Sequence, residues 1–297
     1  MALQFIFGSS GSGKSHSLYK KIIEEAAKHP ERNYIVLVPE QFSMQTQKDL
    51  VEASPDHAIM NIDILSFGRL AYRVMEETGG NQKIVLDDEG KNLILRKIAG
   101  DYEDELTILR GNLKRQGYIS EVKSVISEFA QYDIREEQID AMMEQAGVGT
   151  SLYYKLSDLK KVYQGFYAYL EENYITREEI LDLLCKRVPK SAILKDSVLA
   201  LDGFTGFTPV QNRLLAELLR VCRDVKVTVT IPGSEDPYLY QGPYELFALS
   251  KEMTSRLLLI CREQKIQVKD PVWMDGKVPY RFRKNEPMAF LESHLFR

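Results

Sequence analysis

Apolar runs alternate with amphipathic stretches along the first 80 residues. Three runs are typical of buried strands, at 3–7, 34–38 and 59–65. Apolar positions at helical spacing follow each of them, at 17–28, 41–53 and 67–77. Continuous apolar strands that alternate with helices predict a parallel sheet covered on both faces. Gly79, Gly80 and Asn81 then break the pattern.

The pattern changes from about residue 86 to residue 190, where amphipathic helical stretches such as 121–132 and 152–172 follow one another almost without strand-like runs. We expect an inserted all-helical domain over 86–190. Its aromatic side chains recur at helical spacing, which favours core packing, with base stacking as the alternative. They include Phe129, Tyr132, Tyr153, Tyr154, Tyr163, Phe166, Tyr167 and Tyr169.

Strand and helix patterns return in the last third of the chain. The apolar run 197–202 ends in Asp202, the stretch 210–221 has helical spacing, and 225–231 alternates before Pro232 and Gly233. A split sheet explains this return, so we expect 1–85 and 191–297 to form one discontinuous α/β domain.

The segment Gly8-Ser9-Ser10-Gly11-Ser12-Gly13-Lys14-Ser15 fits the pattern G-x-x-x-x-G-K-[ST] and stands between a predicted strand and a predicted helix. In such a P-loop, backbone N–H groups surround the phosphates, the lysine reaches the β and γ oxygens, and the serine hydroxyl ligates Mg²⁺. The alternative is a flexible Gly/Ser turn. The flanking strand and helix favour a Mg-ATP site in a P-loop NTPase fold.

Asp202 is the expected second half of this site. Its strand ends at the carboxyl edge of the sheet, where a P-loop also lies, and P-loop NTPases hold Mg²⁺ through an aspartate at that place. The alternative is a strand-terminal aspartate that begins a turn at Gly203.

Composition limits the function classes only coarsely. A chain of 297 residues, 44% hydrophobic and 28% charged, can bury a full core. It has no apolar run of eighteen residues, and its first strand begins at once, so we expect a cytoplasmic protein without a membrane span or signal peptide. The widely spaced Cys185, Cys222 and Cys261 predict buried small residues and no iron–sulfur cluster within this chain.

The net charge of −4 is unlike that of a stand-alone nucleic-acid binder. A DNA role would need local basic stripes, although such clusters are more often solvated faces. The candidates are Arg69 and Arg73, then Lys91, Arg96 and Lys97, then Arg110, Lys114 and Arg115.

The segment LDGFTGFTPVQ at 201–211 resembles motif II of superfamily 1 helicases of the UvrD type, D-E-x-Q-D-x-x-P-x-Q. Asp202, Pro209 and Gln211 match in register, which makes Gln211 a possible nucleotide sensor by resemblance. Gly203 stands where these helicases have the glutamate that orients the attacking water, and the following Gln and Asp are Thr205 and Gly206 here. The helicases also carry an adenine-reading glutamine well upstream of the loop, whereas only seven residues precede Gly8 here.

The segments VPEQFS at 38–43 and ILSFGR at 64–69 resemble degenerate motifs Ia and Ib, which touch single-stranded DNA in those helicases. As a set, the motifs resemble the N-terminal region of AddB/RexB, the B subunit of bacterial ATP-dependent helicase–nucleases, over most of the chain. By motif position, the residues expected to face DNA are Gln41, Ser66, Phe67 and Arg69. The alternative for Phe67 is core packing at the head of a helix.

This resemblance implies a RecA-like domain that helps to process double-strand DNA ends for recombinational repair. An AddA/RexA-type partner would drive unwinding while the AddB/RexB protein scans the single strand. Family members are far longer, so we expect an N-terminal portion that lacks the second lobe, the arginine fingers and the nuclease domain with its iron–sulfur cluster. Without these parts, and without a glutamate at position 203, we expect Mg-ATP binding with weak or no hydrolysis.

Two other functions stay open. A structural module with a vestigial nucleotide site would dock a partner subunit and show no ATP affinity. A P-loop small-molecule kinase would need an arginine-rich lid, which the helical block does not supply.

Overall fold

The computed structural model describes residues 1–79, 83–113, 115–171, 174–274 and 279–295, so that Gly80, Asn81 and Lys114 lie outside the described residues. Contacts among the described residues divide the chain into two compact units. Unit 1 comprises 1–78, 185–207 and 211–297, and unit 2 comprises 79–184 with 208–210. No helix in the described ranges is long and apolar enough to cross a membrane.

A parallel sheet forms the centre of unit 1, in the order β3-β2-β6-β7-β1-β8, with β9 also paired to β1. Its buried strands account for the unbroken apolar runs, and the predicted α/β class with a parallel sheet is confirmed. The strands are β1 (Ala2–Gly8), β2 (Tyr34–Leu37), β3 (Ile62–Leu65), β6 (Val198–Leu201), β7 (Asp224–Thr230), β8 (Gln267–Val268) and β9 (Val272–Trp273).

The strand β3 begins three residues later than the predicted run. Met60 is 95% exposed, and the amide group of Asn61 donates to the main-chain carbonyls of Ala26, His29 and Arg32. These bonds hold residue 61 in the turn before the strand, although the apolar pattern around it is typical of a strand.

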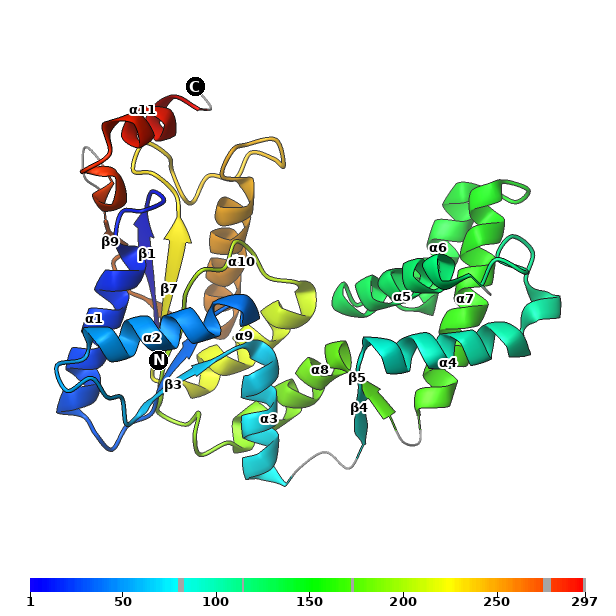
Figure 1. Cartoon of the computed structure of the whole chain (residues 1–297), viewed down its shortest axis with the longest axis horizontal. Helices are drawn as coiled ribbons and strands as arrows, with labels where there is room; N and C mark the ends of the chain where they lie inside the picture. Colours follow the sequence, from blue (N-terminus) through cyan, green and yellow to red (C-terminus); the bar gives the residue numbers. More distant parts are fainter. Residues whose placement is uncertain (80–82, 114, 172–173, 275–278, 296–297) are drawn as a thin grey trace. The chain divides into compact units, whose positions relative to one another are not determined.

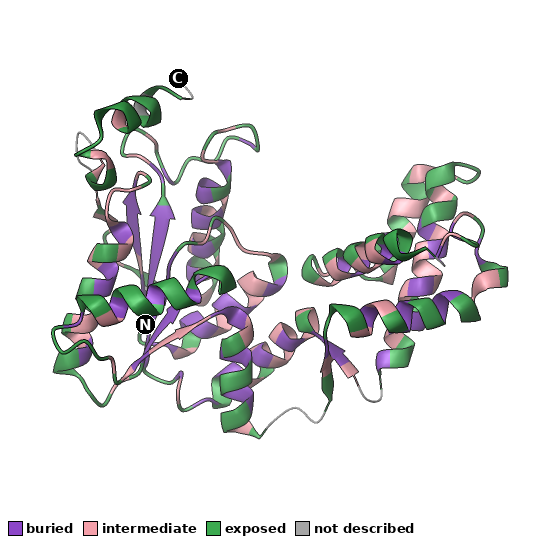
Figure 2. Ribbon diagram, viewed as in Figure 1, coloured by how far each residue is buried: buried purple, intermediate pink, exposed green. Residues whose placement is uncertain are grey.

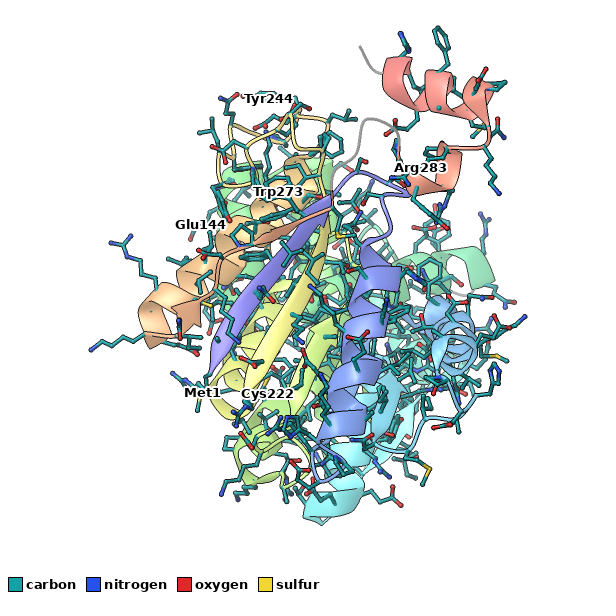
Figure 3. All side chains as sticks on the ribbon, turned by 90° about the vertical axis from the view of Figure 1, so that its left-hand side faces the viewer. Met1, Glu144, Cys222, Tyr244, Trp273 and Arg283 are labelled. Atoms are coloured by element: carbon teal, nitrogen blue, oxygen red, sulfur yellow. The ribbon has the colours of Figure 1, made fainter. Side chains whose placement is uncertain are left out.

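Helices cover both faces of this sheet. Figure 3 shows α1 on one face and α10 on the other, and the strands between them are largely buried in Figure 2. The helices α10 and α11, like β8 and β9, have no counterpart among the predicted elements. The helices of unit 1 are α1 (Lys14–Lys28), α2 (Ser43–Ala53), α3 (Phe67–Thr78), α9 (Pro209–Val221), α10 (Ala248–Gln264) and α11 (Glu286–His294).

The strand β7 lies between β1 and β6, and β1 and β7 run side by side in Figure 1. In register, Gly8 pairs with Thr230, and Leu201 pairs with Val227. The carboxyl ends of β1, β7 and β6 therefore meet at one edge of the sheet. Trp273 and Arg283 lie toward this edge in Figure 3, and Met1 lies at the opposite end.

Unit 2 is mainly helical, but it also contains a small parallel sheet that the sequence pattern did not predict. In this sheet β4 (Ile84–Leu86) pairs with β5 (Tyr174–Thr176). Strands this short leave too few alternating positions to be recognised. The helices are α4 (Asp88–Asp101), α5 (Gln116–Gln131), α6 (Glu136–Ala146), α7 (Ser151–Leu170) and α8 (Arg177–Arg187), which ends beyond the unit boundary.

Buried polar groups correct one sequence-based candidate in unit 2. Lys91 is 3% exposed, and its ammonium donates to both carboxylate oxygens of Glu178 at 2.9 and 2.8 Å and to the Ser127 hydroxyl at 3.2 Å. A lysine that is paired with a carboxylate and enclosed in this way cannot contact a nucleic acid. Lys91 was therefore wrong as a candidate for a basic stripe.

The predicted burial of aromatic residues and cysteines holds for some positions only. Phe129 and Phe166 are core residues, whereas Tyr132 is 58% exposed. Cys222 and Cys261 are buried, and burial raises the pKa of each thiol to about 11. Cys185 is partly exposed.

Candidate functional site

The glycine-rich segment forms a turn between β1, which ends at Gly8, and α1, which begins at Lys14. Gly11 and Gly13 have φ angles of 74° and 99°, in the left-handed region that only glycine adopts without steric cost. The N–H of Ser12 donates to the Ser9 carbonyl at 3.2 Å and closes the turn. Ser10 lies at its exposed outer side. The glycines of the motif are therefore required by the backbone path.

Lys14 is folded back over this turn. Its side chain is 8% exposed, and its ammonium donates to the carbonyl oxygens of Gly8 and Ser9, both at 2.8 Å. The charge therefore lies over the turn that leads into α1. The positive end of a helix dipole and a nearby cation favour an anion at this place.

Asp202 lies directly after β6 and meets the glycine-rich segment. Its carboxylate is 5% exposed, and the Ser15 hydroxyl donates to Oδ1 at 3.1 Å. Thr228 of β7 donates to the same oxygen at 2.5 Å, and the phenol of Tyr19 donates to Oδ2 at 2.5 Å. The structure thus brings together residues 15 and 202, which the sequence pattern assigned to one site.

Tyr19 and Thr228 were not among the sequence-based candidates. Tyr19 lies on the apolar face of α1 with Leu18 and Ile22, where an aromatic residue is typical of a core position. Burial, and then the negative charge of Asp202, raise the pKa of the Tyr19 phenol. The phenol therefore stays protonated at neutral pH and remains a hydrogen-bond donor. A tyrosine one helical turn after Ser15 predicts a contact with Asp202 only once the orientation of α1 is known.

A cavity of about 620 Å³ opens beside the glycine-rich turn. The N–H of Arg281 donates to the Gly11 carbonyl at 3.0 Å, and a Cβ added to Gly11 would lie 2.8 Å from the Cβ of Arg281. Tyr280 and Arg281 are exposed at its rim, and no sequence motif pointed to them. The lining comprises Gly11, Gly13, Lys14, Ser15, His16, Tyr19, Asp49, Glu52, Ala53, Tyr280 and Arg281.

A second cavity, of about 510 Å³, lies at the carboxyl ends of β2, β3 and β6. It collects the three segments that resemble motifs Ia, Ib and II, because parallel strands end at the same edge of a sheet. Arg69 is exposed in the first turn of α3, outside the described lining of this cavity. Among the lining residues are Gln41, Phe42, Ser66, Phe67, Gly203, Phe204 and Gln211.

Ser66 and Phe67 are largely enclosed. Ser66 is 5% exposed, and its hydroxyl accepts a hydrogen bond from the Arg69 N–H at 3.3 Å, as a helix cap does. Phe67 is 7% exposed, with its ring centroid 5.4 Å from that of Phe204 and 6.2 Å from that of Phe207. Phe67 therefore packs as a core residue whose edge reaches the cavity. Gln41 is exposed and Gln211 is half-buried.

Gly203 follows Asp202 with a φ angle of 77°. Other residues adopt this conformation only with strain. The main chain at this position is therefore arranged for glycine and not for the glutamate of the helicase motif.

The donor set fits a magnesium ion with a phosphate chain. Mg²⁺ prefers oxygen ligands, and Ser15 and Asp202 present a hydroxyl and a carboxylate oxygen 3.1 Å apart. The positive φ of Gly13 directs the backbone into α1 without a side chain at the turn. Ser15 and Asp202 are therefore the residues that would hold the metal.

The sheet, the glycine-rich turn and the buried carboxylate define the class: a parallel α/β protein with its candidate site at the carboxyl edge of the sheet. Residues 5–292 match the family described as ADDB, N-terminal. The chain therefore belongs to the AddB family, as its motifs predicted.

Relatives that match the full length of this chain are named as the B subunit of an ATP-dependent helicase/deoxyribonuclease. The protein of Lachnoclostridium phytofermentans is 44% identical over 300 residues, and that of Thermoanaerobacter sp. strain X514 is 35% identical over 296 residues. The protein of Clostridium perfringens strain 13 is 29% identical over 296 residues. The chain spans 26%, 25% and 25% of these relatives, about a quarter of their length.

Proposed function

We propose that unit 1 is a P-loop NTPase domain that binds Mg-ATP. The observation that carries this proposal is the 3.1 Å hydrogen bond from Ser15 to Asp202, which joins the P-loop serine to a strand-end carboxylate. Gly8 to Ser15 would surround the phosphates, and Lys14 would supply positive charge. Arg281 adds a second cation at the rim of the same cavity. Bound Mg²⁺ would neutralise phosphate charge between Ser15 and Asp202.

Hydrolysis by this domain is proposed to be weak or absent. The position after Asp202 holds Gly203, which has no carboxylate to orient a water molecule. Its φ of 77° means that the local backbone is adapted to glycine. ATP would then act here mainly as a ligand.

By analogy with its longer relatives, we propose that this chain serves as part of one subunit of an ATP-dependent helicase/deoxyribonuclease. The enzyme would process double-strand DNA ends in the cytoplasm. The names of the relatives support this role, and a B subunit implies an AddA/RexA-type partner. The cavity at Gln41, Phe67 and Gln211 is the proposed contact for single-stranded DNA during scanning. Phe42, an exposed residue in its lining, offers an aromatic ring for stacking on a base.

A titration of the 297-residue chain with a fluorescent ATP analogue, with Mg²⁺ or with EDTA, tests the nucleotide proposal. We expect saturable binding that Mg²⁺ strengthens, beside phosphate release no faster than the background rate. Turnover of several per second would contradict weak hydrolysis. Absence of binding, with a melting temperature unchanged by Mg-ATP, would instead favour the structural docking module.

The DNA proposal is tested by oligonucleotide binding as a function of salt. Neutralising a cation that contacts a phosphate lowers the salt slope by about one. We expect this change for Arg69→Ala and not for Arg262→Ala, which removes an exposed arginine in the last turn of α10. Equal slopes for wild type and Arg69→Ala would remove Arg69 from the contact surface.

A further inference from the structure

The carboxylate of Asp202 is fixed by hydroxyl groups from separate elements. Oδ1 accepts from Ser15 of α1 and Thr228 of β7, whereas Oδ2 accepts from Tyr19, one helical turn beyond Ser15. The phenol thus holds the oxygen that Ser15 does not contact. A carboxylate bonded at both oxygens cannot rotate about its Cβ–Cγ bond without losing a donor.

The hydroxyl of Tyr19 is itself held in place. Its oxygen lies 3.4 Å from Oγ1 of Thr46 on α2, and because the phenol proton goes to Asp202, Thr46 is the donor in this contact. Tyr19 and Thr46 are 6% and 5% exposed. A chain of hydrogen bonds therefore runs from α2 through α1 to the carboxylate.

We propose that Tyr19 is a positioning residue that orients the Asp202 carboxylate toward the Ser15 side, where the cation of a bound nucleotide would lie. This inference rests on the proposed Mg-ATP site and adds a residue that no P-loop motif specifies. An Asp202 side chain without this donor would spend part of its time turned away from Ser15. Cation binding would then have to restore the orientation, which weakens the metal's contribution to nucleotide affinity.

The test is the magnesium factor of the 297-residue chain, defined as the affinity for a fluorescent ATP analogue with Mg²⁺ divided by the affinity with EDTA. Tyr19→Phe keeps the ring and removes only the hydroxyl. We expect its magnesium factor to fall about tenfold, the size of a lost hydrogen bond to a charged group. Affinity in EDTA should stay within about twofold, because the turn and Lys14 are untouched.

Tyr34→Phe is the matched control. Tyr34 is 1% exposed in the same core cluster, but it begins β2, at the edge of the sheet opposite Asp202. Its magnesium factor should equal that of wild type. Thr46→Val leaves Tyr19 intact but removes the hydrogen bond that Thr46 donates to its hydroxyl. We expect the magnesium factor of this variant to fall about threefold. This variant tests the same hydroxyl if Tyr19→Phe does not fold, as judged by circular dichroism.

A double-mutant cycle separates positioning from general loss of structure. Asp202→Asn should remove most of the magnesium factor, and Tyr19→Phe should have no further effect in that background. The positioning role of Tyr19 is overturned if Tyr19→Phe leaves the magnesium factor unchanged, or if it lowers the factor as much in the Asp202→Asn background as in wild type. Either result leaves the Mg-ATP proposal standing. A wild-type chain that binds no nucleotide, or binds it equally with and without Mg²⁺, overturns both the Mg-ATP site and the positioning role.

Discussion

At the residue scale, the main feature of the candidate site is the contact of Lys14 with the carbonyl oxygens of its own turn, which holds a positive charge in place. Because Lys14 is only 8% exposed, its ammonium is already partly desolvated, and a phosphate that replaced the carbonyls would meet a charge that water shields little. Ser15 and Asp202 supply a second polar pair beside it. Hydrogen bonds within the chain therefore already hold the polar side chains of the candidate site in position.

Replacing Lys14 with methionine tests the role of its charge. Methionine keeps a flexible stem of similar length but cannot donate, so we expect the affinity for Mg-ATP to fall at least tenfold, about the usual cost of losing a bond to a charged group. The same nucleotide titration measures it. Lys28→Met, at the exposed end of the same helix, is the control and should bind as wild type does. Equal affinities for both variants would contradict a phosphate role for Lys14.

Gly203→Glu restores the residue type of the helicase motif, but we expect no recovery of hydrolysis. The φ of 77° is unfavourable for glutamate, and the strain should lower the free energy of unfolding by about 1–2 kcal/mol. Gly206→Glu is the matched control, because Gly206 has open space and no positive φ. Urea unfolding and phosphate release measure the outcome. A stable, hydrolysing Gly203→Glu variant would show that the backbone does not limit catalysis.

At the element scale, the sequence predicted what depends on local pattern. The strand, glycine turn and helix at 2–28 follow from adjacent residues, and Asp202 follows from an apolar run with a polar end. The edge strands β8 and β9 depend on pairing with β1, which a window of sequence does not contain. The contacts of Tyr19 and Arg281 depend in the same way on distant partners. The periodicity of a segment predicts which face of a helix or strand is buried, but not which distant residue packs against that face.

Unit 2 contains a loop that a single carboxylate organises. Asp158 of α7 is 1% exposed and accepts hydrogen bonds from the N–H groups of Thr107, Ile108 and Leu109, at 2.7–3.0 Å. The loop residues follow α4, so these bonds join α7 to the chain after that helix. Nothing in the helical pattern distinguished Asp158 from a solvated acid.

Asp158→Asn should therefore destabilise unit 2. An amide replaces one acceptor oxygen with an NH₂ group. Even with its oxygen at the Oδ2 place, this NH₂ group would face the Thr107 N–H, donor against donor, at the 2.9 Å now spanned by the bond to Oδ1. That contact and the lost negative charge should cost about 2–3 kcal/mol. Urea unfolding measures the total, and hydrogen exchange should become faster at residues 107–109. Asp140→Asn, in a half-exposed pair with Lys160, is the control and should cost less than about 1 kcal/mol. Similar losses for the two variants would contradict the role of Asp158.

At the scale of the whole molecule, the chain combines a parallel α/β unit with a mainly helical unit. The candidate nucleotide residues from Gly8 to Ser15, with Asp202, all belong to unit 1. The relatives are about four times as long, so the helicase and deoxyribonuclease activities in their names belong to a much larger protein. Sequence motifs identified the family because they lie at the ends of parallel strands. There, a short local pattern also predicts where the residue lies in the fold, namely at the carboxyl edge of the sheet.

Mg-ATP should protect unit 1 selectively. A ligand that binds only the native state stabilises it by about 2.7 kcal/mol at a concentration about one hundred times the dissociation constant. We therefore expect slower hydrogen exchange at residues 8–15 and 200–203, with unchanged exchange in α5 and α6 of unit 2. Exchange measured with ATP and EDTA is the control. Uniform protection of both units, or none, would contradict a nucleotide site confined to unit 1.

The hydrogen bond from the Arg281 N–H to the Gly11 carbonyl links the glycine turn to the main chain just before α11. A displacement of Gly11 on ligand arrival must either pull residue 281 with it or break this bond. We therefore expect a displacement of the turn to reach the main chain before α11, and a spectroscopic label on that helix would report it.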